Sequence, residues 1–95
     1  MTWLRIFKNK SIAEYIIEFD CWENCEPIEV QLEPDGMVFT ASANEKLKFL
    51  ARGYGDFRWI VRFSGDVLSG VQLFPVSKSD YNVNVYLNNE HIYYL

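Results

Sequence analysis

Cys21, Cys25 and His91 are the residues of this chain best suited to metal binding or nucleophilic chemistry. A structural zinc site takes four ligands, and His91 lies 66 residues beyond Cys25. The acids around the two cysteines should raise the thiol pKa and so disfavour the reactive thiolate. We therefore expect ordinary reduced cysteines, with a local disulfide formed on oxidation and a metal or redox role as the alternatives. No metal and no cofactor are predicted.

His91 offers the only imidazole for general base catalysis. It follows Glu90 in a predicted hairpin, with no glycine elbow or helix end nearby to present a nucleophile. Acids are so plentiful that a close pair of carboxylates is expected by chance, which makes their number uninformative. The sequence therefore predicts no catalytic residue, and we expect a protein that is not an enzyme.

The distribution of charge is more unusual than its total of −4. Residues 11–35 hold eight acids and no Lys or Arg. If this stretch is extended, one face presents acids around an exposed tryptophan, and we expect that face to bind a protein. Its residues are Glu14, Glu18, Asp20, Trp22, Glu29 and Glu33. The alternative is that Arg5, Arg58 and Arg62 lie on adjacent strands and neutralise these acids.

Size and composition indicate one compact domain over residues 1–95. The chain is 49% hydrophobic and 17% aromatic, enough to build a core without disulfide or metal support. No apolar run approaches the roughly 20 residues that cross a bilayer, so we expect a cytoplasmic protein without membrane contact. The acidic balance argues against direct binding of nucleic acid, which requires a basic surface.

Alternation of apolar and polar residues predicts strands along most of the chain. Residues 2–8 are expected to form a strand that is apolar on both faces. Residues 28–41 predict a hairpin with its turn at Pro34, Asp35 and Gly36. Residues 57–63, 70–76 and 81–95 predict further strands, the last as a terminal hairpin.

One segment, residues 43–52, is predicted to be an amphipathic helix. Ser42 and Glu45 match a capping box, Gly53 is placed to end the helix, and an apolar stripe recurs at helical spacing. The predicted fold is α+β, with a twisted antiparallel sheet of about seven to eight strands and this helix on one face. Residues 11–20 are ambiguous: we favour a strand, but a second helix there would give a ferredoxin-like fold.

The chain ends on a predicted strand rich in tyrosine. Tyr86, Tyr93 and Tyr94 cannot all face one core, and an unpaired strand edge favours pairing with another chain. We therefore expect self-association, with a dimer as the first choice.

These observations favour a noncatalytic, self-associating interaction protein that uses an acidic and aromatic surface, with a basic protein as a possible partner. Two alternatives remain open. A curved sheet rich in aromatic residues could enclose a small molecule and make the chain a carrier. The acids could instead imitate nucleic acid and inhibit a basic protein.

Overall fold

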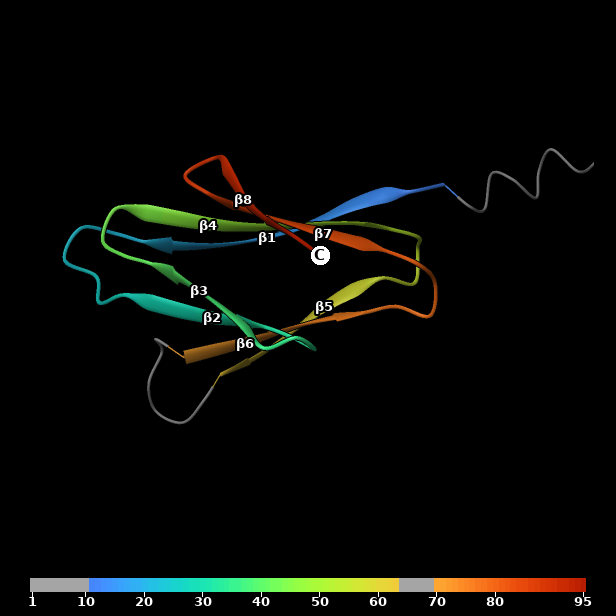
Figure 1. Ribbon diagram of the computed structural model, residues 1–95, viewed down its shortest axis with the longest axis horizontal. Coiled ribbons are helices and arrows are strands. Elements are labelled where there is room, and N and C mark those ends of the chain that lie inside the picture. Colours follow the sequence, from blue (N-terminus) through green and yellow to red (C-terminus); the bar gives the residue numbers. More distant parts are fainter. Residues whose placement is uncertain (1–10, 64–69) are drawn as a thin grey trace, which may run out of the picture.

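The computed structural model describes residues 11–63 and 70–95, and the described chain is a sandwich of two four-stranded sheets (Figure 1). The first sheet has the strand order β1-β4-β7-β8 and the second β3-β2-β6-β5. The strands are β1 Ala13–Cys21, β2 Ile28–Leu32, β3 Met37–Ala41, β4 Glu45–Gly53, β5 Arg58–Phe63, β6 Gly70–Val76, β7 Asn82–Leu87 and β8 Glu90–Tyr94. The strand expected at residues 2–8 lies outside the described residues.

The predicted α+β fold is wrong, because no described residue is helical. Residues 43–52 fall mainly in β4, which pairs with both β1 and β7 in the middle of the first sheet. The ferredoxin-like alternative is also wrong, whereas the preference for a strand over residues 11–20 is confirmed by β1. The described strands number eight, but they form two sheets, and β2 and β6 pair in parallel.

A turn replaces the expected helix start. The Glu45 amide donates to the Ser42 carbonyl at 2.9 Å, and the Ser42 amide donates to Glu45 Oε1 at 2.7 Å. The second contact is the one a capping box would make, but here it closes a β-turn in which Asn44 has a φ of +67°. The contact between Ser42 and Glu45 is thus compatible with either a helix start or a β-turn. The residues after Glu45 determine which of the two forms.

Those residues alternate with period two. Leu47, Phe49 and Ala51 are fully buried, while Lys46 and Arg52 point outward. Gly53 does not take a left-handed conformation; a Cβ on it would lie 3.3 Å from the Cβ atoms of both Phe57 and Tyr81. Its lack of a side chain lets these two rings close over the end of β4.

Aromatic side chains fill the space between the sheets. Phe49 of β4 packs edge-on against Phe39 of β3 and Trp59 of β5, with ring centroids 5.8 and 6.4 Å apart. The Trp59 indole also donates to the backbone carbonyl of Tyr15 at 3.0 Å, which ties β5 to β1 across the sandwich. These aromatic side chains therefore join the two sheets.

Both predicted hairpins are confirmed. β2 and β3 pair in register, with Gly36 at a φ of +73° in the connecting turn. β7 and β8 are joined by Asn88 and Asn89, which both have positive φ as a tight two-residue hairpin turn requires. A register shift between Val85 and Tyr86 places Ile92 as an extra residue in β8.

Candidate functional site

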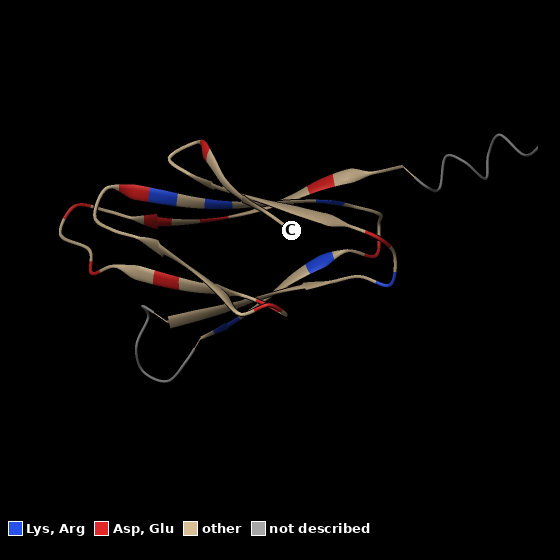
Figure 2. Ribbon diagram, viewed as in Figure 1, with Lys and Arg blue, Asp and Glu red and all other residues tan. Residues whose placement is uncertain are grey.

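The six residues predicted as one acidic face are divided among three places. Glu14, Glu18 and Asp20 alternate along the outer face of the first sheet, as the strand interpretation of β1 requires. Glu29 and Glu33 belong to the second sheet and lie on the opposite side of the sandwich. Figure 2 shows acidic residues on both layers of the fold. The structure therefore does not bring the six residues into one surface.

The acids of β1 face cations of β4. Glu14 lies opposite Arg52 in register, and the two form an ion pair with 3.1 Å between Oε2 and Nη2. Glu18 and Asp20 lie opposite Lys48 and Lys46. These cations were missed by the sequence analysis because they had been assigned to a helix, although the alternation of Lys46, Lys48 and Arg52 with apolar residues was a sign of a strand.

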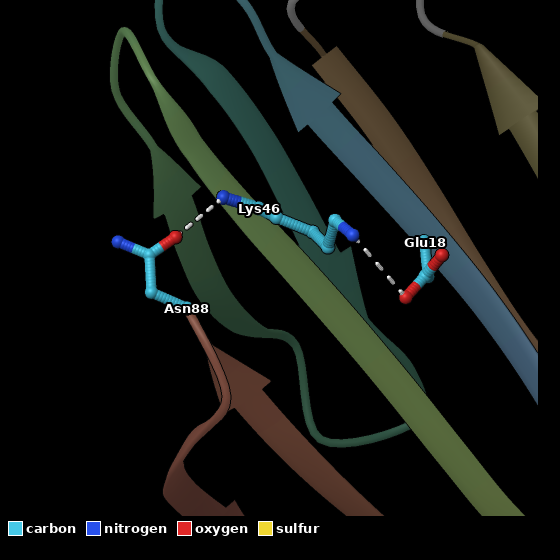
Figure 3. A network of polar contacts seen from close by, with 3 residues as sticks. All are labelled: Glu18, Lys46 and Asn88. Carbon is cyan, nitrogen blue, oxygen red and sulfur yellow. Dashed lines mark hydrogen bonds and ion pairs between the residues drawn. The ribbon is translucent and has the colours of Figure 1, made fainter.

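Lys46 also connects β1 to the terminal hairpin. Its ammonium lies 3.9 Å from Glu18 Oε2, and its backbone amide donates to Asn88 Oδ1 at 2.9 Å (Figure 3). The backbone amide of Asn88 in turn donates to the backbone carbonyl of Lys46 at 2.9 Å. Lys46 is therefore partly engaged by Glu18 and held in place by its backbone.

Arg58 and Arg62, proposed as alternative neutralising groups, lie on β5 in the second sheet and form no ion pair within the described residues. Arg5 lies outside the described residues. In the second sheet, Glu33 is held instead by two amides, since Gln31 Nε2 and Gln72 Nε2 donate to its Oε2 at 2.7 and 3.0 Å.

One end of the sandwich collects acids around an exposed tryptophan. Trp22 directly follows β1 and is 75% exposed. It starts a turn in which the Cys25 amide donates to the Trp22 carbonyl at 3.1 Å, with Asn24 at a φ of +68°. The turn places Trp22 beside a shallow hollow of about 290 Å³. The hollow is lined by Asp20, Cys21, Trp22, Glu23, Asn44, Glu45 and Lys46.

We call Asp20, Trp22, Glu23 and Glu45 the acid-tryptophan end. It joins two residues predicted for the acidic face, Asp20 and Trp22, to two that were not predicted for it, Glu23 and Glu45. Asp20 and Glu23 take part in neither ion pair seen among the described residues. Three carboxylates therefore share this hollow with a single ammonium, that of Lys46. Acidic residues are visible along the β1–β2 connection and at the start of β4 in Figure 2.

The two cysteines lie at the base of the same end. Both are free, with Cys21 buried and Cys25 partly exposed. Both thiols donate to the backbone carbonyl of Glu26, at 3.3 and 3.1 Å. Burial, the neighbouring Cys25 thiol and the charge of Glu45 raise the pKa of Cys21 to about 11. Within the described residues, no three His, Cys, Asp or Glu side chains are grouped so that they could hold a metal ion.

His91 lies in the terminal hairpin, far along the chain from both thiols. Its Nε2 is 2.9 Å from Asn84 Oδ1, and its ring centroid is 5.2 Å from that of Tyr86. The Lys48 ammonium lies 4.8 Å from the Tyr86 ring centroid on the same face. His91 is therefore part of a polar row on the outer surface of the first sheet.

The tyrosines predicted for self-association have three different environments. Tyr86 lies in that polar row. Tyr93 points inward, with its ring 5.3 Å from that of Phe39. Tyr94 is 64% exposed on β8, an edge strand of the first sheet.

The described part of the chain has no helix of the length and apolar character needed to cross a membrane. Comparison with known protein families, with curated proteins and with solved structures found no match to this chain.

Proposed function

We propose that this protein is a noncatalytic binding protein whose acid-tryptophan end holds a positively charged segment of another protein. The observation that carries the proposal is the 75% exposed indole of Trp22 beside a hollow with three carboxylates. A large aromatic side chain left in water, beside carboxylates that form no ion pair with the described residues, suits a partner that is both cationic and partly apolar.

Arginine fits this combination better than lysine. Its planar guanidinium can stack on an indole and also donate two parallel hydrogen bonds to a carboxylate. A cation over an exposed aromatic ring contributes about 0.5–1 kcal/mol. The acids add long-range attraction, which is screened beyond about 8 Å at physiological salt. Affinity is therefore expected to fall as salt is added.

The distribution of the remaining acids favours a short basic segment over a large basic surface. Glu14 is paired with Arg52, and Glu33 is occupied by the amides of Gln31 and Gln72. An imitation of nucleic acid would need its negative charges in a regular array on one side, whereas these acids lie on opposite sheets. The acid-tryptophan end is compact and suits a few residues of a partner.

The proposal is tested by measuring the binding of an arginine-rich peptide at increasing salt concentration. Two double variants of equal net charge are compared: D20N/E23Q, which alters the acid-tryptophan end, and D35N/D80N, which alters exposed loop acids elsewhere. The first should weaken binding several-fold and flatten the salt dependence, and the second should leave both near wild type. Equal loss in the two variants, or binding that is indifferent to salt, would refute the proposal.

We further propose that the chain self-associates through β8. Reciprocal hydrogen bonds join Val83 and Leu95, so the backbone groups of the preceding residue, Tyr94, point away from β7 toward the open edge. The side chains of Ile92 and Tyr94 on the same strand are exposed. The opposite edge, β1, carries a column of acids that would repel a second copy of itself. A two-fold pairing of β8 with β8 is therefore the favoured dimer.

The proposed site of action is the cytoplasm. The support is the pair of free thiols, since reduced cysteines are usual in that compartment.

A further inference from the structure

The two cysteines form a pair in the folded chain. Cys21 ends β1 and Cys25 closes the turn that follows. Their sulfurs lie 3.3 and 3.1 Å from one acceptor, the Glu26 carbonyl oxygen, so the two thiols are neighbours. Because both sulfurs contact the same oxygen, they lie on the same side of the turn, and rotation of the two side chains can bring them toward the roughly 2.05 Å of a disulfide bond.

Trp22 and Glu23 lie between these cysteines in sequence. Any bond joining the two thiols would close a ring of five residues that includes half of the acid-tryptophan end. The backbone of this ring is already bent into a turn by the bond from the Cys25 amide to the Trp22 carbonyl. A covalent link would therefore fix the direction in which the indole leaves the sheet.

We propose that Cys21 and Cys25 are a modification site, at which exchange with a small disulfide such as oxidised glutathione forms a reversible internal disulfide. Its role as a control of partner binding rests on the function proposed above; the formation of the bond does not.

The exchange proceeds in two steps. The thiolate of Cys25, which is the more accessible of the two, attacks one sulfur of oxidised glutathione; the S–S bond of glutathione breaks, and one glutathione thiolate leaves. Cys21 then loses its proton to water and attacks the Cys25 sulfur, which releases the second glutathione. Two protein thiols are oxidised, one glutathione disulfide is reduced to two thiols, and each departing thiolate can take up a proton.

The second step is expected to be slow at neutral pH. Burial and the charge of Glu45 raise the pKa of Cys21 and keep it protonated. The rate of ring closure should therefore rise with pH above neutrality, because the fraction of Cys21 present as the reactive thiolate increases. Because only the second step is slow, brief exposure to oxidised glutathione would leave the mixed disulfide on Cys25 rather than the internal disulfide.

The experiment incubates the reduced, folded full chain with oxidised glutathione at pH 8.5 and follows the intact mass. The expected product has lost two hydrogens and retains no glutathione, and digestion without reductant gives a peptide that links Cys21 to Cys25. A persistent glutathione adduct, a disulfide between two chains, or no reaction would each overturn the proposed site.

Two matched variants separate the steps. Cys21→Ser should stop at a stable glutathione adduct on Cys25, because the resolving thiol is missing. Cys25→Ser should remain largely unmodified while folded, because Cys21 is buried. Rapid modification of Cys21 in folded Cys25→Ser would contradict the proposed order. Thermal unfolding of each variant confirms that the folded state is the one tested.

The effect on binding is measured with the arginine-rich peptide on the reduced and oxidised wild-type chain. We expect the dissociation constant to change at least three-fold and to return to its starting value after reduction. If the disulfide forms and the affinity does not change, the control function is refuted while the modification site stands. If neither form binds the peptide, the failure belongs to the proposed function.

Discussion

At the scale of single residues, Trp22 is the side chain whose position is hardest to explain by stability alone. It is 75% exposed, whereas Trp59 packs against Phe49 and Phe57 and donates its indole N–H to the Tyr15 carbonyl. These two of the chain's three tryptophans thus have different roles: Trp59 joins the sheets, and Trp22 is presented to solvent at the end of β1.

Replacing Trp22 with alanine should therefore affect binding without affecting stability. Loss of a cation–aromatic contact of about 0.5–1 kcal/mol corresponds to about a two- to five-fold weaker affinity for the arginine-rich peptide, which calorimetry would measure. The melting temperature should stay within a degree or two. Phe63→Ala, at a side chain that is 58% exposed on β5, is the control and should bind normally. A large drop in the melting temperature of Trp22→Ala would assign the indole a structural role.

Cys21 makes a second prediction at this scale, on pH. Its folded pKa of about 11 lies above the ordinary value of 9.0, because of burial, the Cys25 thiol and the charge of Glu45. The unfolded chain therefore loses this proton at a lower pH than the folded chain. The resulting stabilisation is present below pH 9 and is lost as pH rises toward 11.

Denaturant titrations from pH 8 to pH 11 test this expectation by comparing wild type with Cys21→Ala. Other groups titrate in this range in both proteins, so the difference between the two curves isolates the thiol. That difference should shrink steadily above pH 9. A difference that is constant across the range would contradict the raised pKa.

At the scale of elements, β4 shows what the sequence could and could not predict. Strands β1, β2, β3, β5, β6, β7 and β8 were expected near their observed positions, because alternation and turn residues are local signals. β4 was misassigned because its residues satisfy both a helical stripe and a period of two. The partition into two sheets depends on which strands pair over long distances, and no local pattern in the chain contains that information.

Because β4 was taken for a helix, the sequence analysis did not find the cations that face the acids of β1. Lys46, Lys48 and Arg52 could be recognised as partners of β1 only after β4 was known to lie beside it. Asp20 and Trp22 were correctly expected to point outward from β1. Glu23 and Glu45 were not connected with them, since the turn that brings Asn44 and Glu45 next to Trp22 belongs to a distant part of the sequence.

The hairpin between β7 and β8 carries a prediction of its own. Asn88→Gly keeps the positive φ of the turn but removes the hydrogen bond that the Lys46 backbone amide donates to Asn88 Oδ1 (Figure 3). We expect a loss of about 0.5–1.5 kcal/mol in the free energy of unfolding. Asn89→Gly is the matched control, since Asn89 has a similar φ of +68° and glycine is readily accepted there. Equal losses in the two variants would show that the side-chain bond contributes nothing.

At the scale of the whole molecule, the sandwich has unequal edges. β1 has acids along its outer face and is tied at Tyr15 to Trp59 of the opposite sheet. β8 is short and exposes Ile92 and Tyr94. Charge on an edge strand discourages pairing with other chains, so the two edges of the first sheet differ in their capacity for self-association.

Sedimentation equilibrium tests this difference. The wild-type chain is expected to dimerise, and Tyr94→Lys should be monomeric at the same concentration, because it places a charge on the pairing edge. Val38→Lys is the control, at a side chain that is 51% exposed on β3 at an edge of the second sheet, and it should remain dimeric. A monomeric wild type, or a dimer that survives Tyr94→Lys, would rule out the β8 interface.

The central claim is that the end of the sandwich around Trp22 is the binding surface, and amide NMR of the uniformly labelled chain during titration with the arginine-rich peptide measures it most directly. The account predicts the largest, saturable shift changes at residues 20–23 and 44–46, together with the indole N–H of Trp22. Saturable changes centred on β8 or on the outer face of the second sheet, with these residues unaffected, would contradict it.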